Sequence, residues 1–327
     1  MNVVGLEEHI ATADLFAAWR RFGTQDLAMQ LTERVAEPLM ELGAGRLAAM
    51  DEAGIDTAVL SVTTPGLQQL PPAEALALQA PTNDVIADAV RRHPNRFHGF
   101  ATLATSSPAR AARELERAIV ELGLHGVMLH SLAGSDFLDA PRYWDIFEAA
   151  EHCRAPVYLH PSAPPAPVEA AYYRGLDETV GGVLGTGAPG WHYQTGIALL
   201  RLILAGLFDR FPHLQLIVGH WGEMVLFYLD RIALLDGFSS LDRPLSDYFR
   251  TNVFITPGGI ASHRYLRWAT EVVGIDRIMH ATDYPFNSAT DFSARDFLAT
   301  AALSVEERQK IACGNWTAVV EQVCRPR

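Results

Sequence analysis

The chain has 327 residues, of which 49% are hydrophobic, so it can bury the core of one large α/β barrel or of two smaller domains. Its formal net charge of -12, with no run of Lys or Arg, argues against nucleic acid and anionic membrane surfaces as partners. Three widely spaced cysteines, and no pattern for export or membrane spanning, lead us to expect a reducing cytoplasm.

The first predicted strand covers residues 3–9 and ends in Glu7, Glu8 and His9. Alternate side chains of a strand share a face, so we expect Glu7 and His9 to point one way with Gly5, and Glu8 to point the other way. A carboxylate beside an imidazole suits a divalent metal. Taken alone, such a pair is more often a hydrogen-bonded surface pair than a metal site, so the rest of the chain must decide.

After this strand, residues 11–42 show short helical patterns and no strand, which predicts an elaborated loop. From residue 56 onward, strands of about six residues alternate with helices of about 12 to 20. The other predicted strands cover residues 56–62, 97–102, 126–130, 156–160, 214–220, 253–256 and 278–283. The predicted helices cover residues 73–92, 108–122, 141–153, 192–210, 222–236, 261–273 and 290–312.

This alternation implies right-handed crossovers and a parallel sheet, and eight such units can close into a (β/α)8 barrel. We therefore predict a single barrel domain over residues 1–327, with a long loop over residues 161–190 after the fifth strand. An open, doubly wound sheet is the alternative. No Gly-x-Gly-x-x-Gly pattern follows the first strand, which disfavours the nucleotide-binding version of that fold.

Four predicted strands end in residues that bind metals or move protons. They are Glu7 and His9, His160, His220 with Glu223 three residues later, and Asp283. Singly, each has an ordinary structural interpretation, such as a helix cap or a hydrogen-bonded core histidine. In a barrel, however, all strand ends surround one mouth, where barrels place their chemistry.

Glu7, His9, His160 and Asp283 would supply two nitrogen and two carboxylate ligands. This set suits four-coordinate Zn2+ or part of a six-coordinate Mn2+ or Mg2+ site. His220 is then either a fifth ligand or an acid/base held in one tautomer by Glu223.

The motifs together resemble those of the amidohydrolase superfamily. They are Glu-x-His on the first strand, His-Pro after the fifth, Gly-His-x-Gly-Glu after the sixth and Thr-Asp-x-Pro-Phe after the eighth. The chain is most similar to the decarboxylase branch that acts on 2-amino-3-carboxymuconate-6-semialdehyde and on hydroxybenzoates. Within it, the γ-resorcylate enzymes also begin with Leu-Glu-Glu-His.

The resemblance implies that Glu7, His9, His160 and Asp283 are metal ligands and that His220 and Glu223 form a catalytic pair with Asp283. It also implies substrate contacts by Arg231 and Phe286, and we add Phe22 as a candidate to stack on an aromatic ring. The family further implies a homodimer or homotetramer.

Two residues depart from the family pattern. Binuclear members bridge their metals with a carboxylated lysine, but the only lysine, Lys310, lies in the last predicted helix, away from any strand end. We therefore expect one divalent metal, Zn2+ before Mn2+ or Mg2+. His130 stands where the γ-resorcylate enzymes have Asn, so we expect it to contact a different substituent of the substrate.

We therefore predict a metal-dependent, non-oxidative decarboxylase of a hydroxylated aromatic acid, in which Asp283 protonates the ring carbon before CO2 leaves. Glu7 in place of a histidine adds negative charge and weakens the activation of metal-bound water, which favours a lyase. The alternatives are a mononuclear hydrolase of a lactone or amide, and a metal-free binding protein.

Overall fold

The computed structural model describes residues 1–23, 27–287 and 293–324. Seven parallel strands form one sheet in chain order, whereas a doubly wound sheet reverses its order at a switch point. The open alternative therefore does not describe this sheet. Its strands are β1 (Val4–Ile10), β2 (Thr57–Val62), β3 (Phe97–Ala101), β4 (Gly126–His130), β7 (Val157–His160), β8 (Leu216–Val218) and β9 (Val253–Ile255).

The predicted eighth strand contains two isolated bridges rather than a continuous ladder. Ile278 bridges to Ile255 of β9, and Ala281 bridges to Leu6 of β1. The segment thus lies between the two outermost strands, and the sheet is curled.

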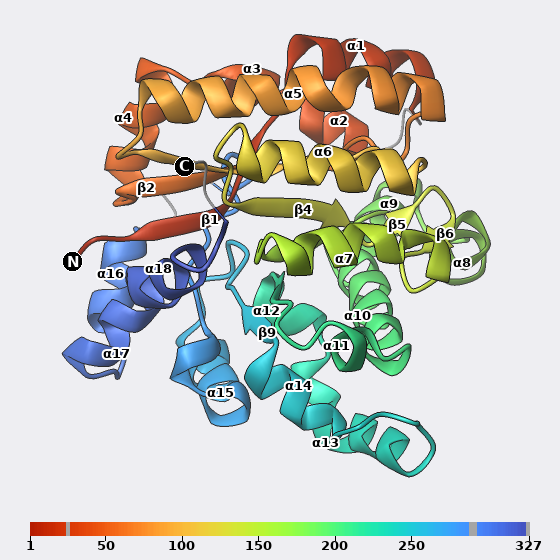
Figure 1. Ribbon diagram of the computed structural model, residues 1–327, viewed down its shortest axis with the longest axis vertical. Coiled ribbons are helices and arrows are strands. Elements are labelled where there is room, and N and C mark those ends of the chain that lie inside the picture. Colours follow the sequence, from red (N-terminus) through yellow and green to blue (C-terminus); the bar gives the residue numbers. More distant parts are fainter. Residues whose placement is uncertain (24–26, 288–292, 325–327) are drawn as a thin grey trace.

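Helices cover the outside of the sheet, and Figure 1 shows α1, α5 and α6 along one side and α13 to α15 at the other end. Local signals set several helix ends: α6 begins with a proline in its first turn, and α4 ends at Gly54, whose φ of +73° suits glycine. The main connecting helices are α4 (Ala44–Ala53), α5 (Pro72–Arg92), α6 (Pro108–Val120), α7 (Trp144–His152), α10 (Gly190–Leu204), α11 (Leu207–Arg210), α14 (Leu245–Thr251) and α15 (His263–Val273). In the described ranges, no helix is both long and apolar enough to cross a membrane.

Two segments predicted as loops contain helices. The segment after β1 holds α1 (Ala13–Phe22), α2 (Leu27–Arg34) and α3 (Ala36–Met40), and the segment after β7 holds α8 (Ala166–Tyr172) and α9 (Glu178–Gly185). A short hairpin, β5 (Leu132–Ala133) and β6 (Asp136–Phe137), follows β4. The helices after β1 match the short helical patterns seen in residues 11–42, whereas the elements after β7 and β4 are too short to leave a clear periodicity in the sequence.

The helix predicted over residues 222–236 is broken. Trp221, Gly222 and Met224 have φ of 59°, 88° and 66°, which no right-handed helix accommodates. The segment instead forms the short turns α12 (His220–Glu223), η2 (Leu226–Tyr228), α13 (Leu229–Ile232) and η3 (Ala233–Gly237).

The last predicted helix is also divided, and residues 290–292 of that prediction lie outside the described residues. The C-terminal part contains α16 (Ala294–Thr300), α17 (Val305–Gln309), a π-helical turn η6 (Lys310–Gly314) and α18 (Asn315–Val320). Ser304 and Glu307 form a capping box at the start of α17.

Two hydrophobic clusters hold the layers together. The larger packs the helices against the outer face of the sheet, and the smaller fills the inside of the curl. We call the smaller one the inner cluster; its buried members are Val4, Leu6, Val59, Phe100, Met128, Tyr158, Ile217, Phe254, Met279, Ala281, Trp316, Val319 and Val320. Because α18 supplies three of these side chains, the C-terminal helix closes the inner cluster at one end.

Candidate metal centre and active site

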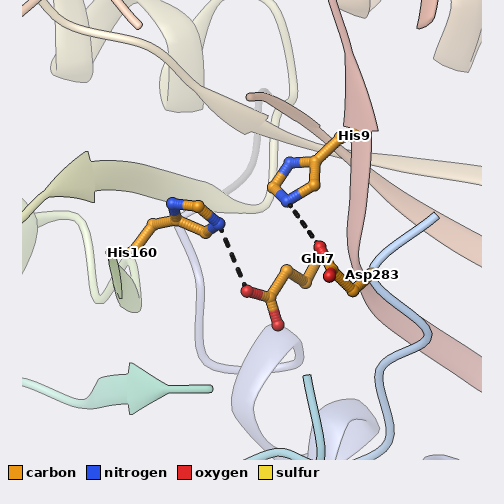
Figure 2. Close-up of side chains that lie close together, drawn as sticks. All are labelled: Glu7, His9, His160 and Asp283. Carbon is orange, nitrogen blue, oxygen red and sulfur yellow. Dashed lines mark ion pairs between the residues drawn. The ribbon is translucent and has the colours of Figure 1, made fainter. Parts of the chain in front are cut away.

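The predicted metal ligands lie together at the ends of strands that are distant in sequence. Glu7 and His9 are on β1, His160 ends β7, and Asp283 follows the bridge at Ala281 (Figure 2). One ligand atom from each of the four lies within 4.8 Å of the others. Strand ends therefore bring two nitrogens and two carboxylate oxygens to one point, as the motifs predicted.

A bulge in β1 turns Glu7 toward this point. The register to β2 shifts between Gly5 and Glu8, and Glu7 has a φ of +63°. Val4 and Leu6 belong to the inner cluster, so strict alternation would have placed Glu8, not Glu7, inside. We expected Glu7 and His9 on one face and Glu8 on the other, which is correct; the expected shared face with Gly5 is wrong, because the bulge intervenes.

The ligand atoms are oriented but lack ordinary partners. Nε2 of His160 lies 3.3 Å from Oε1 of Glu7, and Nε2 of His9 lies 3.3 Å from Oδ1 of Asp283 (Figure 2). Oε1 of Glu7 and Nε2 of His9 are buried and make no hydrogen bond. Buried polar atoms without partners are costly, so the donor set fits a metal ion held between these residues.

The far side of each ligand is held by the protein. Nδ1 of His9 lies 3.3 Å from Oγ of Ser61, and Nδ1 of His160 lies 2.9 Å from the carbonyl oxygen of Pro161. The hydroxyl of Tyr158 donates to Oε2 of Glu7 at 2.6 Å. These contacts leave the Nε2 atoms and Oε1 facing the centre, which is how proteins orient metal ligands.

Sequence reasoning missed Tyr158. Its signal was its position two residues before His160 on the same strand, which puts both side chains on one face. Tyr158 also lies 2.9 Å from Oγ1 of Thr256, so Glu7 is tied to the end of β9 as well.

The acidic residues at the centre have opposite pKa shifts. Burial raises the pKa of Glu7, but the positive charges of His220, His160 and His9 outweigh burial and bring the pKa to about 2. Burial and the neighbouring charge of Glu7 raise the pKa of Asp283 to about 8. Two close carboxyl groups thus differ in charge state at neutral pH, as is common at functional sites.

The predicted pair His220 and Glu223 forms a second group beside the first, together with His192. Oε1 of Glu223 lies 2.8 Å from Nδ1 of His220, and Oε2 lies 2.8 Å from Nδ1 of His192. Nε2 of His220 is 3.9 Å from Oε1 of Glu7, so the two groups are adjacent. Burial lowers the pKa of His220, but the charges of Glu223 and Glu7 outweigh it and raise that pKa to about 10. Sequence reasoning missed His192, because α10 carries it to α12 from a stretch without a motif.

Strained backbone is concentrated at these residues. Glu7, His220, Glu223 and Asp283 are four of the non-glycine residues with positive φ. Each such conformation costs roughly 1–3 kcal/mol and persists only where the surroundings impose it. The strain therefore marks the same residues that the motifs selected.

Glu8 points away from the centre and connects β1 to the segment that carries Asp283. Its carboxylate accepts from the backbone N–H of Thr282 at 3.1 Å and from the Thr282 hydroxyl at 2.7 Å. Burial raises the pKa of Glu8 to about 7, against the opposing charge of Arg46. Arg46 is itself buried, donates to the carbonyl oxygen of His9 at 2.9 Å and lies over the Tyr284 ring.

The predicted substrate residues lie at different distances from the centre. Phe286 meets the His9 ring edge-on, with centroids 5.8 Å apart, and His130 meets the His160 ring in the same way at 5.2 Å. Phe22 lines a neighbouring cavity of about 360 Å³ with Trp19 and Trp191. Arg231 is exposed on α13 and is not among the residues lining the cavity of about 250 Å³ over His220.

The chain resembles known proteins over almost its full length. It is 32% identical over 327 residues to γ-resorcylate decarboxylase of Polaromonas sp. (strain JS666), covering 95% of this chain and 96% of that one. The structure of 5-carboxyvanillate decarboxylase LigW from Sphingomonas paucimobilis matches with a TM-score of 0.89 at 32% identity, covering 98% and 99% of the two chains.

A third match is the structure of a dihydroxybenzoic acid decarboxylase from Polaromonas sp. JS666, which contains manganese and the inhibitor 2-nitroresorcinol. Its TM-score is 0.86 at 30% identity, covering 98% of this chain and 97% of that one. The amidohydrolase family model matches residues 12–320. The geometry of the candidate ligands, the curled parallel sheet and these matches agree: the chain belongs to the amidohydrolase family.

Proposed function

We propose that the protein is a metal-dependent, non-oxidative decarboxylase of a hydroxylated aromatic carboxylic acid. The observation that carries the proposal is the largely buried group of Glu7, His9, His160 and Asp283, in which Oε1 of Glu7 and Nε2 of His9 lack hydrogen-bond partners. The group occurs in a chain that is similar along its length to decarboxylases acting on hydroxylated benzoates.

We infer that residues 278–283 complete the sheet as the eighth strand of a (β/α)8 barrel, and that residues 1–327 form one domain. The bridges from this segment to both β1 and β9 support this inference. The candidate metal ligands would then surround the mouth at the carboxyl ends of the strands.

The four ligands would hold one divalent ion. Zn2+ is our first expectation from the ligand types, and the manganese in similar decarboxylases supports testing Mn2+ beside it. When bound, the ion would hold the substrate carboxylate and an adjacent oxygen and would favour the phenolate. Lys310 pairs with Asp276 at 2.7 Å, consistent with a single ion and no bridging lysine.

The residues of the chain would manage the protons. Asp283, at the edge of the group and bonded to the Asn287 amide at 2.9 Å, would give its proton to the ring carbon bearing the carboxylate. The bond from that carbon to the carboxylate then breaks, its electron pair restores the aromatic ring, and CO2 leaves. His220, held by Glu223, would take up or return the phenol proton.

Aromatic residues and Arg231 would position the ring. Phe286 lies against His9 at the centre, and Phe22 lines the neighbouring cavity. Arg231 is exposed and does not line the cavity over His220, so family resemblance alone supports our proposal that it binds the substrate carboxylate; Arg231→Ala is then expected to raise KM with little change in kcat. Unchanged kinetics would show that Arg231 has no such role.

The activity test uses a panel of 2-hydroxybenzoates with Zn2+, Mn2+ or Mg2+ and measures CO2 release. We expect turnover, and Asp283→Asn should lower kcat by about 10²- to 10⁴-fold. Asp88→Asn, on the exposed surface of α5, is the matched control and should leave kcat unchanged. Turnover of lactones or amides without CO2 release from any benzoate would establish a hydrolase instead.

The metal test is independent of activity. Elemental analysis should find about one divalent ion per chain, and Glu7→Ala should lose it, whereas Glu33→Ala near the surface should retain it. A Glu7→Ala variant with full metal content would place the metal elsewhere.

We also propose a homodimer or homotetramer. Phe227, Tyr228 and Phe238 are 60%, 60% and 89% exposed along the segment from η2 to the end of η3, an apolar surface that a second copy could cover. Light scattering would test this assembly. A cytoplasmic location stays a prediction.

A further inference from the structure

His130 is held in one position by three neighbours. Its Nδ1 lies 2.9 Å from Oε1 of Gln68, and its ring meets the His160 ring edge-on. A Cβ on Gly66 would lie 2.5 Å from Cε1 of His130, so the backbone of that loop packs directly against the ring. The loop is anchored in turn, because Trp19 donates from its indole to the Gly66 carbonyl at 2.8 Å.

The contact with Gln68 also sets the tautomer. With the amide oxygen of Gln68 turned toward it, as in this structure, Nδ1 of His130 donates the hydrogen bond and carries the proton. In the neutral imidazole, Nε2 then has a lone pair and no proton. His130 is 1% exposed, and the remaining nitrogen, Nε2, makes no hydrogen bond.

A bound metal ion does not explain why Nε2 of His130 lacks a partner. His130 does not belong to either group of the described residues whose ligand atoms lie within 4.8 Å of one another. A buried acceptor beside the metal ligands instead calls for a donor that arrives with the ligand, because an acceptor left unpaired is costly.

We propose that His130 makes the enzyme selective for substrates with a ring hydroxyl that donates a hydrogen bond to Nε2. The inference rests on the proposed decarboxylation of hydroxylated aromatic acids. It adds a second ring hydroxyl that the enzyme recognises, besides the hydroxyl next to the carboxylate. A methoxy group at the same ring position has no proton to donate and would leave Nε2 unpaired. The substrate class is therefore a dihydroxylated benzoate rather than its methyl ether.

The test compares 2,3-, 2,4-, 2,5- and 2,6-dihydroxybenzoate, each with the compound in which the second hydroxyl is methylated. At the ring position that faces His130, the wild-type kcat/KM should be about ten- to a hundredfold higher for the dihydroxybenzoate than for its methyl ether. His130→Phe keeps a planar ring without an acceptor and should abolish the preference. His213→Phe, at an exposed position, is the matched control and should keep it.

A second variant separates recognition from packing. Gln68→Met removes the acceptor that holds the proton on Nδ1, so the preference should shrink although His130 is still present. Wild-type metal content and circular dichroism in each variant exclude misfolding as the cause. No preference at any ring position, or a preference that survives His130→Phe, would overturn the proposal.

Failure of the proposed function can be told apart from failure of this inference. If no benzoate is decarboxylated, calorimetric binding of catechol, resorcinol and hydroquinone is compared with that of their monomethyl ethers. Tighter binding of one diphenol by wild type and not by His130→Phe would support the role of His130. Equal binding of every pair would overturn it.

Discussion

At the scale of single residues, the atoms facing the candidate metal are governed by contacts on the opposite side of each ligand. Tyr158, Ser61 and the carbonyl of Pro161 hold Glu7, His9 and His160 respectively. Such contacts set both the direction and the basicity of a ligand. The strongest candidate for mutation is Tyr158, because its 2.6 Å bond to Glu7 is the shortest of the three.

Tyr158→Phe should weaken metal binding by about tenfold or more, because Glu7 loses the donor that holds Oε2. The Kd for Mn2+, measured by competition with a chelating dye, checks this expectation. Tyr143→Phe is the matched control, since its hydroxyl contacts Arg142 and Asp136 away from the centre. Equal metal affinity in Tyr158→Phe and wild type would contradict the positioning role.

At the scale of elements, the bulge in β1 is what directs Glu7 and His9 to the centre. Gly5 and Glu8 lie on the outer side of the bulge, and a Cβ on Gly5 would lie 2.5 Å from Oε1 of Glu8. Glu8 in turn bonds Thr282, next to Asp283. Because Gly5 has no side chain, it leaves space for the Glu8 carboxylate to bond Thr282 and so to connect β1 with the segment that carries Asp283.

Gly5→Ala should therefore displace the Glu8 carboxylate, lower the free energy of unfolding by about 1–3 kcal/mol and reduce metal content. Urea unfolding and elemental analysis measure the two effects. Gly187→Ala is the control, because a Cβ there meets no atom within 4 Å. A Gly5→Ala protein as stable and as metal-rich as the Gly187→Ala protein would show that Glu8 adapts without loss.

At the scale of the whole molecule, the inner cluster joins all seven strands to the C-terminal helix. Trp316 of α18 is 2% exposed, packs edge-on against Phe100 with centroids 5.6 Å apart, and donates to Nδ1 of His98 at 3.0 Å. Residues at the two ends of the chain therefore depend on one another for burial.

Trp316→Ala should lower the free energy of unfolding by about 3–5 kcal/mol, because it opens a cavity inside the curled sheet. Val305→Ala, at a position 81% exposed on α17, should change it by less than about 0.5 kcal/mol. Denaturant unfolding compares the two variants with wild type. A small loss for Trp316→Ala would mean that α18 is not part of the cooperative core.

The stability of the whole fold should also depend on His280, because burial lowers its pKa to about 4. The unfolded chain binds a proton near pH 6.5 and the folded chain does not, so stability is lost as the pH falls from 6.5 toward 4. Protonation of His280 in the unfolded chain lowers the free energy of unfolding by up to about 3 kcal/mol over this pH range. His280→Gln should flatten the stability profile in this window, and exposed His213→Gln should not; equal slopes in all three proteins would contradict this account.

Motifs at strand ends predicted the strand order, the candidate metal ligands and the contact of His220 with Glu223, because each depends on residues close in sequence and on the alternation of strands and helices. The short helices after β7 could not be predicted, since elements of one or two turns carry little periodicity, whereas residues 11–42 already showed short helical patterns. The turn after β8 could not be predicted either, because its left-handed residues include Trp221 and Met224, which rarely adopt that conformation.

The sequence by itself determined which residues can bind a metal and that parallel strands would bring them to one end of the sheet. Only the tertiary structure decided which face of β1 they occupy: Val4 and Leu6 fill the inner cluster, and one extra residue at Glu7 then turns Glu7 and His9 inward. It also decided that Tyr158, His192 and Gln68 support the site, because these contacts join strands and helices distant in sequence. Local patterns record secondary structure, whereas a bulge and its packing depend on neighbours that only the folded chain supplies.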